Sequence, residues 1–125
     1  DGFKNINDKY GHETGDIFLK RISQRFINSA RKSDTVSRIG GDEFIILMPR
    51  IINTTDAANL AERIIESNIL PININNNLLF PMASIGISVY PEDGSSIEEL
   101  IKKSDKAMYN AKRLGKNKYL FYKNC

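Results

Sequence analysis

The 125-residue sequence is poor in the residues from which many sites are built. Its single cysteine, Cys125, cannot form a disulfide within the chain. One cysteine and one histidine, His12, cannot make a zinc site, and His12 is more readily explained as a packing residue at a helix start. No Walker-type loop or Gly-x-Gly-x-x-Gly segment occurs, and no serine has a histidine and an acid at a recognisable spacing. Zinc sites, serine triads and the usual nucleotide cradles are therefore excluded.

Long apolar runs are absent too. No segment approaches the ~20 apolar residues of a membrane helix, and we expect no secretory leader. Hydrophobic residues make up 41% of the chain and charged residues 26%, which is typical of one soluble globular domain with one core. The net charge of +3 favours an anionic ligand but is too small to indicate nucleic acid. We expect a cytoplasmic domain without a nucleic-acid partner.

The stretch Arg38–Phe44 (RIGGDEF) organises the chain. Thr35–Ile39 before it and Phe44–Met48 after it read as strands. The two glycines between them predict a hairpin, because a tight primed turn needs positive φ at its central residues. Asp42 and Glu43 follow at the exposed tip, where carboxylates beside side-chain-free backbone can bind a metal ion and admit phosphates. A solvated hairpin tip is the alternative interpretation.

Three further segments have the apolar periodicity of amphipathic helices. Each has apolar residues on one side and residues that favour the start or the end of a helix. The expected helices run from His12 to near Lys32 (Phe18, Ile22, Phe26), from a cap at Thr54–Asp56 (Ala57, Leu60, Ala61, Ile64), and from a cap at Ser95–Ser96 to Gly115 (Ile97, Leu100, Ile101, Met108, Ala111, Leu114).

The remaining segments read as a short helical turn and strands. Phe3, Ile6 and Tyr10 give the turn an apolar side. The pattern as a whole predicts an α/β domain with an antiparallel hairpin in its sheet and three helices on one face. The expected strands are a short edge strand at Ile72–Ile74 before a turn at Asn75–Asn77, a half-buried strand at Ala83–Tyr90 and a last strand at Tyr119–Tyr122.

Other side chains could complete a site with the two carboxylates. Mg²⁺ takes one or two carboxylates, and phosphoryl transfer then needs cations around the phosphates. Asn7 and Asp16 could hydrogen-bond a base edge, or serve only in a turn and a helix cap. The cations that could serve phosphates, each otherwise a surface charge, are Lys4, Arg38, Lys112 and Lys116.

Four blocks of the sequence together resemble the GGDEF-domain diguanylate cyclases, bacterial enzymes that condense two GTP into cyclic di-GMP. They are Arg38–Phe44, Asp1–Asp16 (similar to D-x-F-K-x-I-N-D-x-x-G-H-x-x-G-D), Ser84–Ser88, and Ala107–Lys112 with Gly115–Asn117. They span nearly the whole chain in order. The resemblance implies a single domain over residues 1–125 with an α/β (α+β) fold, in which helices pack on a ferredoxin-like or polymerase-palm-like antiparallel sheet.

At the catalytic edge, the resemblance implies that Asp42 coordinates Mg²⁺ (or Mn²⁺). Glu43 would lie close to the attacking ribose 3′-hydroxyl as the candidate base. Gly40 and Gly41 would leave room for GTP, and Lys4 would stabilise charge that develops on the phosphates.

For the remainder of GTP, the resemblance implies that Asn7 and Asp16 hydrogen-bond guanine while Leu19 packs on the base. An acidic acceptor for guanine N1–H and its 2-amino group discriminates against adenine. Where many members have arginine, this chain has Lys116, which keeps the charge but loses the bidentate fork. The basic residues assigned to the phosphates or their surroundings are Arg38, Lys112 and Lys116.

A second, inhibitory site is also implied. Arg31-Lys32-Ser33-Asp34 resembles the R-x-x-D motif through which the product, cyclic di-GMP, inhibits the family. Arg31 can pair with a phosphate or guanine of the dinucleotide, and Asp34 with a guanine edge. Arg63 matches a position that contributes from a neighbouring subunit.

The sequence departs from the family pattern at its start. Family members have a further metal-binding aspartate two residues before the position of Asp1, on a central strand that follows a helix. We therefore expect a domain incomplete at its N-terminus, with its first strand and helix missing and exposed sheet edges that could pair with another copy. Such a fragment could be inactive.

The expected partners are GTP, cyclic di-GMP and a second copy, because one domain holds one GTP and offers half an active site. An upstream sensory or regulatory domain is also expected, and upstream segments could attach the full protein to a membrane. The alternatives are a non-catalytic module that binds GTP or cyclic di-GMP, and a structural dimerisation domain.

Overall fold

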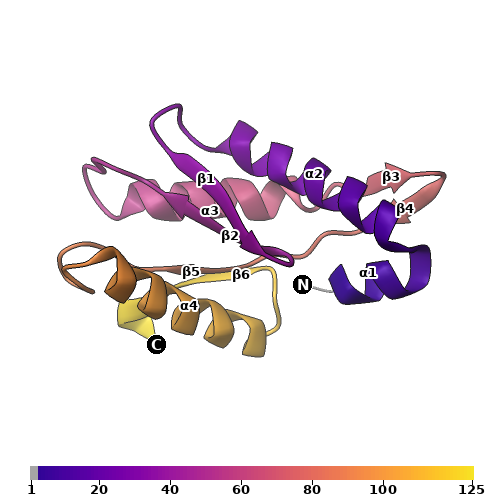
Figure 1. The fold of residues 1–125 in the computed structure, drawn as a ribbon. Helices are drawn as coiled ribbons and strands as arrows, with labels where there is room; N and C mark the ends of the chain where they lie inside the picture. The colour runs from indigo at the N-terminus through magenta and orange to yellow at the C-terminus, as the bar shows by residue number, and fades with distance from the viewer. Residues whose placement is uncertain (1–2) are drawn as a thin grey trace.

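The computed structural model describes residues 3–125 (Figure 1). Asp1 and Gly2, which begin the first family-like block, lie outside the described residues. The elements in chain order are α1 (Phe3–Tyr10), α2 (His12–Ser29), β1 (Thr35–Gly40), β2 (Glu43–Leu47), α3 (Thr55–Ser67), β3 (Ile72–Ile74), β4 (Asn77–Leu79), β5 (Ser84–Ile87), α4 (Ile97–Arg113), β6 (Lys118–Phe121) and a 3-10 turn (Tyr122–Asn124).

The strands form three separate pairs rather than one sheet within residues 3–125. β1 with β2 and β3 with β4 are antiparallel hairpins, whereas β5 with β6 is parallel. The parallel pairing follows from the connectivity. α4 lies between these two strands in the chain and returns the chain to the end of the pair at which β5 began, so β6 runs in the same direction as β5. The mixed helix and sheet class that the sequence predicted is confirmed.

Helices lie on both sides of the β5–β6 pair, so the expectation that three helices share one face is wrong. Figure 1 shows α3 on one side of β5 and β6 and α4 on the other. α4 approaches β5 very closely at Gly86, where a Cβ atom would overlap the Ser104 carbonyl oxygen and the Met108 backbone nitrogen. Glycine is needed there because backbone meets backbone.

The first two helices pack against the β3–β4 hairpin. The buried cluster there consists of Phe18, Ile72, Ile74 and Leu79, with Phe3, Ile6, Tyr10, Ile17 and Ile22 packed against it. The apolar side predicted for the first segment is thus confirmed, although α1 is longer than a single turn.

α2 ends at Ser29, earlier than the predicted end near Lys32. Ala30 is extended, with φ −81° and ψ 160°. The carboxylate of Asp34 accepts a hydrogen bond from the Arg31 backbone N–H at 2.8 Å, so a local side-chain turn replaces the next helical turn.

Both predicted turns are present in the two hairpins. β1 and β2 pair from Thr35 with Leu47 to Gly40 with Glu43, with an irregularity between Arg38 and Gly40. In the second hairpin Asn75 and Asn76 have φ of 52° and 67°, the values a primed turn requires. Asn77, predicted within that turn, instead begins β4.

The apolar stripe predicted for α3 is confirmed, since Ala57, Leu60, Ala61 and Ile64 are its buried residues. The predicted cap differs. Thr54 makes no side-chain cap, and the Asn53 Oδ1 accepts from the Thr55 backbone N–H at 2.9 Å, an Asx-type turn. The carboxylate of Asp56 accepts from Ile52 N at 3.0 Å, so residues on both sides of Thr54 hold the helix start.

The cap of α4 is confirmed but its stripe is only partly correct. Ser96 Oγ accepts from Glu99 N at 3.1 Å. Ala107 and Ala111 are its buried residues, whereas Ile97 and Leu114 are each 62% exposed. The close approach to Gly86 accounts for the buried Ala107, because only small residues fit where helix and strand backbones touch. The C-cap is Leu114, and Gly115 follows with φ 121°.

The strand predicted at Ala83–Tyr90 is shorter, from Ser84 to Ile87. Beyond it, the Val89 N–H donates to the Asp93 carboxylate at 2.7 Å instead of a neighbouring strand, which ends the ladder. No helix within residues 3–125 is long and apolar enough to cross a membrane.

Candidate active site

The glycine turn between β1 and β2 holds two acidic side chains at its end. Gly40 and Gly41 have φ of 156° and 49°, which disfavours any larger residue, although open space surrounds both positions. Arg38 Nε donates to the Gly41 carbonyl oxygen at 2.7 Å across the turn. Asp42, in the turn, is half-buried, and Glu43, the first residue of β2, is exposed.

The hairpin is fixed to α2 by an aromatic contact that sequence reasoning missed. The rings of Phe26 and Phe44 meet edge to face, with centroids 4.9 Å apart and an interplanar angle of 88°. Phe44 directly follows Glu43, so this contact places the acidic tip relative to α2. The apolar stripe of α2 was the available signal, because it included Phe26.

Lys112, in the last turn of α4, acts electrostatically on Asp42. Burial, the largest single effect, raises the pKa of Asp42, and the positive charge of Lys112 is among the effects that lower it. A lysine that acts on the Asp42 carboxylate is compatible with a site that also binds phosphates.

A metal ion would find an open donor set at this tip. Within residues 3–125, no group of three His, Cys, Asp or Glu side chains is arranged to hold a metal ion. The tip offers the carboxylate of Asp42 with Glu43 adjacent. That set fits Mg²⁺, which commonly binds one or two carboxylates and keeps water and phosphate oxygens as its other ligands.

The residues predicted to bind guanine lie on α1 and α2. Gly11 joins these helices with φ 92°, and in the view of Figure 1 the hairpin tip points toward α1. Lys4 and Asp16 are exposed, and Asn7 is half-buried. Leu19 is only 5% exposed, so little of its apolar surface is available to pack against a base.

Lys116 lies in the loop after α4, in a left-handed conformation with φ 63°. The next residue, Asn117, anchors this loop, because its Oδ1 accepts from the Ala83 backbone N–H at 2.9 Å. Lys116 is exposed at the end of α4 that also carries Lys112.

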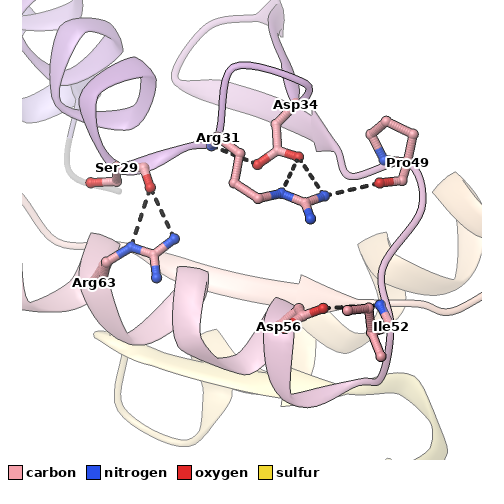
Figure 2. A network of polar contacts seen from close by, with 7 residues as sticks. All are labelled: Ser29, Arg31, Asp34, Pro49, Ile52, Asp56 and Arg63. Atoms are coloured by element: carbon pink, nitrogen blue, oxygen red, sulfur yellow. Dashed lines mark hydrogen bonds and ion pairs between the residues drawn. The ribbon is translucent and has the colours of Figure 1, made fainter.

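The R-x-x-D motif forms a closed network in the structure (Figure 2). Arg31 Nε and Nη2 donate to Asp34 Oδ1 at 3.0 and 2.9 Å, and Nη2 also donates to the Pro49 carbonyl oxygen at 2.9 Å. The hydrogen bond that Arg31 donates to Asp34 raises the pKa of Arg31. Sequence reasoning paired both residues with a ligand and missed their pairing with each other. They lie beside a cavity of about 240 Å³ lined by Ile27, Ala30, Arg31, Lys32, Asp34 and Val36.

Arg63 does not line this cavity. Its Nε and Nη2 donate to the Ser29 carbonyl oxygen at 3.2 and 3.0 Å, so it caps the last turn of α2 in its own chain (Figure 2). Arg25 of α2 does the reverse, donating to the carbonyl oxygens of Ser67 and Leu70 at the end of α3. Arg25 and Arg63 thus link the antiparallel helices α2 and α3 by hydrogen bonds in both directions.

A larger cavity of about 440 Å³ is lined by none of the predicted site residues. The Tyr119 hydroxyl donates to Glu62 Oε1 at 2.9 Å at its wall, and this hydrogen bond raises the pKa of Tyr119. The cavity is lined by Glu62, Ile65, Glu66, Asn117, Lys118 and Tyr119.

Comparisons with known proteins agree with this geometry. The family model described as "Diguanylate cyclase, GGDEF domain" matches residues 1–118. The chain is 42% identical over 124 residues to the bifunctional diguanylate cyclase/cyclic di-GMP phosphodiesterase MucR of Pseudomonas aeruginosa, a match covering 99% of the chain and 18% of MucR. It is 38% identical over 122 residues to the cyclic di-GMP phosphodiesterase NbdA of the same organism, covering 98% of the chain and 16% of NbdA.

Among solved structures, the GGDEF domain of TpbB (YfiN) from Pseudomonas aeruginosa matches with a TM-score of 0.92 at 37% identity, covering 97% of the chain and 76% of that structure. The fold and the glycine hairpin thus define a nucleotide-signalling domain. The chain belongs to the GGDEF-domain family of diguanylate cyclases. It spans less than a fifth of the length of the two curated relatives, at 18% and 16%.

Proposed function

We propose that this chain is a diguanylate cyclase domain that condenses two GTP into cyclic di-GMP. The observation that carries the proposal is the hairpin tip, where the carboxylates of Asp42 and Glu43 directly follow a glycine turn. The cyclase activity named for MucR, at 42% identity, supports the same reaction.

The reaction consists of two nucleotidyl transfers. The 3′-oxygen of each GTP bonds to the α-phosphorus of the other, and the bond from that phosphorus to the bridging oxygen of the β-phosphate breaks. The electron pair leaves with pyrophosphate, so two pyrophosphates are released for each cyclic di-GMP. Glu43, exposed at the start of β2, is the candidate to accept the 3′-hydroxyl proton.

Asp42 would hold Mg²⁺ or Mn²⁺. When bound, such an ion offsets the negative charge of the triphosphate and stabilises charge on the leaving oxygen. Lys4 would stabilise charge that develops on the phosphates, while Lys112 and Lys116 would hold the outer phosphates. Arg38 would act through the turn, because its Nε is bonded to the Gly41 carbonyl oxygen.

Guanine would be recognised at the α1–α2 pair. Asn7 and Asp16 would hydrogen-bond the base, and Leu19 would form the floor beneath it. Each chain holds one GTP in this arrangement, so catalysis requires two copies facing one another, with the 3′-hydroxyl of one directed at the α-phosphate of the other.

Product inhibition would act at the R-x-x-D network. Arg31 and Asp34 lie beside a cavity of about 240 Å³, so cyclic di-GMP binding there would compete with their own ion pair. Arg63, proposed to contribute from a neighbouring copy, would first have to leave the Ser29 carbonyl oxygen.

A non-catalytic module that binds GTP or cyclic di-GMP to regulate an attached domain is the second candidate. The observation that favours it is the similarity to NbdA, which is named only as a phosphodiesterase. In this case the hairpin would bind nucleotide without turnover.

One experiment separates the two functions. The full-length protein is incubated with GTP and Mg²⁺ at concentrations where it dimerises, and cyclic di-GMP and pyrophosphate are quantified by chromatography. A yield of two pyrophosphates per dinucleotide, lost in Asp42→Asn, is the expected result. Calorimetric GTP binding without any dinucleotide would favour the regulatory module, and the absence of binding would rule out both functions.

A further inference from the structure

α2 contains a glycine that its backbone does not require. Gly15 is buried near the helix start, its φ is outside the left-handed region, and its N–H donates to the Gly11 carbonyl oxygen at 3.1 Å. Glycine within a helix is less favourable than alanine by roughly 0.5–1 kcal/mol. The reason for glycine here must therefore be the space around it.

That space is occupied by α1. A Cβ atom on Gly15 would overlap Asn7 Oδ1 and would lie 3.0 Å from Asn7 Cγ and 3.1 Å from Phe3 Cε1. Because Cγ would also be closer than nearly all real contacts with a Cβ atom, an added methyl group would force the Asn7 carboxamide to shift. The carboxamide of Asn7 thus rests directly on the backbone of Gly15.

Packing, not hydrogen bonding, sets the position of the buried end of this carboxamide. Asn7 Oδ1 is buried and has no hydrogen-bond partner among the described residues. The backbones of the two residues are linked through Gly11, because Gly11 N donates to Asn7 O at 2.8 Å and Gly15 N donates to Gly11 O. The backbone of Asn7 is therefore linked to the start of α2 by hydrogen bonds, and its carboxamide occupies the space that a side chain on residue 15 would fill.

We infer that Gly15 is a positioning residue for guanine recognition, and this inference rests on the proposed contact between Asn7 and the base. Gly15 does not touch the nucleotide. Its missing side chain sets how deeply the Asn7 carboxamide sits, and so where that group meets a base edge. A methyl group at position 15 pushes the carboxamide outward and alters base selectivity, while phosphate binding by Lys112 and Lys116 is unaffected.

The first test compares binding of GTP and ATP to the full-length protein and to Gly15→Ala by calorimetry. Gly15→Ala should weaken GTP binding about tenfold, the equivalent of one hydrogen bond, with ATP binding nearly unchanged. Ser23→Ala, which also raises helix propensity in α2 but adds no atoms near α1, should leave both affinities unchanged.

The outcomes separate this inference from the proposed function. A wild-type protein without preference for GTP over ATP would overturn the proposed function, and this inference with it. A wild-type preference that Gly15→Ala fully retains would overturn this inference alone.

A double-mutant cycle with Asn7→Ala tests whether Gly15 acts through Asn7. Once the carboxamide is removed, adding Gly15→Ala should cause no further loss of GTP affinity. An equal loss in both backgrounds would contradict the inference. If Gly15→Ala alone does not fold, the double variant should, since it lacks the overlap with Asn7; a double variant that is also unfolded would overturn the inference.

Discussion

The glycine hairpin and the R-x-x-D network use charged residues in opposite ways. In the network, Asp34 has a fully buried side chain and satisfies Arg31, which in turn bonds to the Pro49 carbonyl oxygen. At the hairpin, the backbone is held by glycine conformation and by Arg38, while Glu43 is exposed. The buried Asp34 carboxylate contributes mainly to the fold, whereas Glu43 lies exposed at a rigid turn where a ligand can reach it. The two regions should therefore respond differently to substitution.

The largest effect is expected at the hairpin, from Asp42→Asn. This change removes the proposed metal-binding charge but keeps the shape of the side chain, so dinucleotide synthesis should fall by ~100-fold or more, as when a charge-stabilising group is lost. The free energy of unfolding should change by no more than about 0.5 kcal/mol. Turnover of GTP and thermal melting measure the two quantities. Substantial activity in this variant would contradict the proposed role of Asp42.

Asp34→Ala should show the reverse behaviour. It removes the acceptor of the Arg31 backbone N–H and of two guanidinium hydrogen bonds. The unfolding free energy should drop by about 2 kcal/mol, while synthesis in the absence of product remains and inhibition by cyclic di-GMP is lost. Denaturant titration and inhibition curves provide the readouts. The exposed neighbour Ser33→Ala is the matched control, with stability within about 0.5 kcal/mol of wild type.

Arg63→Ala tests whether this arginine belongs to the fold or only to the inhibitory site. Because its guanidinium caps the last turn of α2 at Ser29, its loss should lower the unfolding free energy by about 1 kcal/mol. Asn59→Ala, at an exposed position of the same helix, serves as the comparison and should not destabilise the protein. A fully stable Arg63→Ala variant with altered inhibition would assign the residue to ligand binding alone.

The smallest effect concerns the loop that leads from the hairpin into α3. Asn53→Ala should cost about 0.5–1 kcal/mol because Asn53 accepts from the Thr55 N–H, whereas Thr54→Ala should cost less than about 0.5 kcal/mol. Chemical denaturation of the two variants side by side decides the order. The opposite order would place the cap at Thr54, within the segment Thr54–Asp56 that the sequence pattern predicted.

Local patterns accounted for much of the fold. The β1–β2 hairpin follows from its glycines, and the buried face of α3 from its spacing of apolar residues, because both depend on neighbours in the chain. Long-range packing decided the rest. The buried face of α4 depends on backbone contact with Gly86, and the end of α2 on the Asp34 turn, neither of which periodicity reveals.

The candidate site was predictable to a similar extent. The sequence located the acidic tip and the R-x-x-D motif, since both are short segments. It did not reveal that Arg31 and Asp34 bind one another, or that Phe26 and Phe44 hold the tip against α2. These contacts depend on how separate elements pack, which the motifs do not contain.

The close contact between β5 and α4 has a consequence for the active site. Because the backbone at Gly86 meets α4 at Ser104 and Met108, the helix cannot slide along the strand without a collision. Lys112 lies one helical turn beyond Met108, on the same side of α4. The position of Lys112, which is proposed to hold phosphates, thus depends on Gly86, a residue without a side chain on β5. A slip of one helical turn would displace the ammonium group of Lys112 by about 5.4 Å.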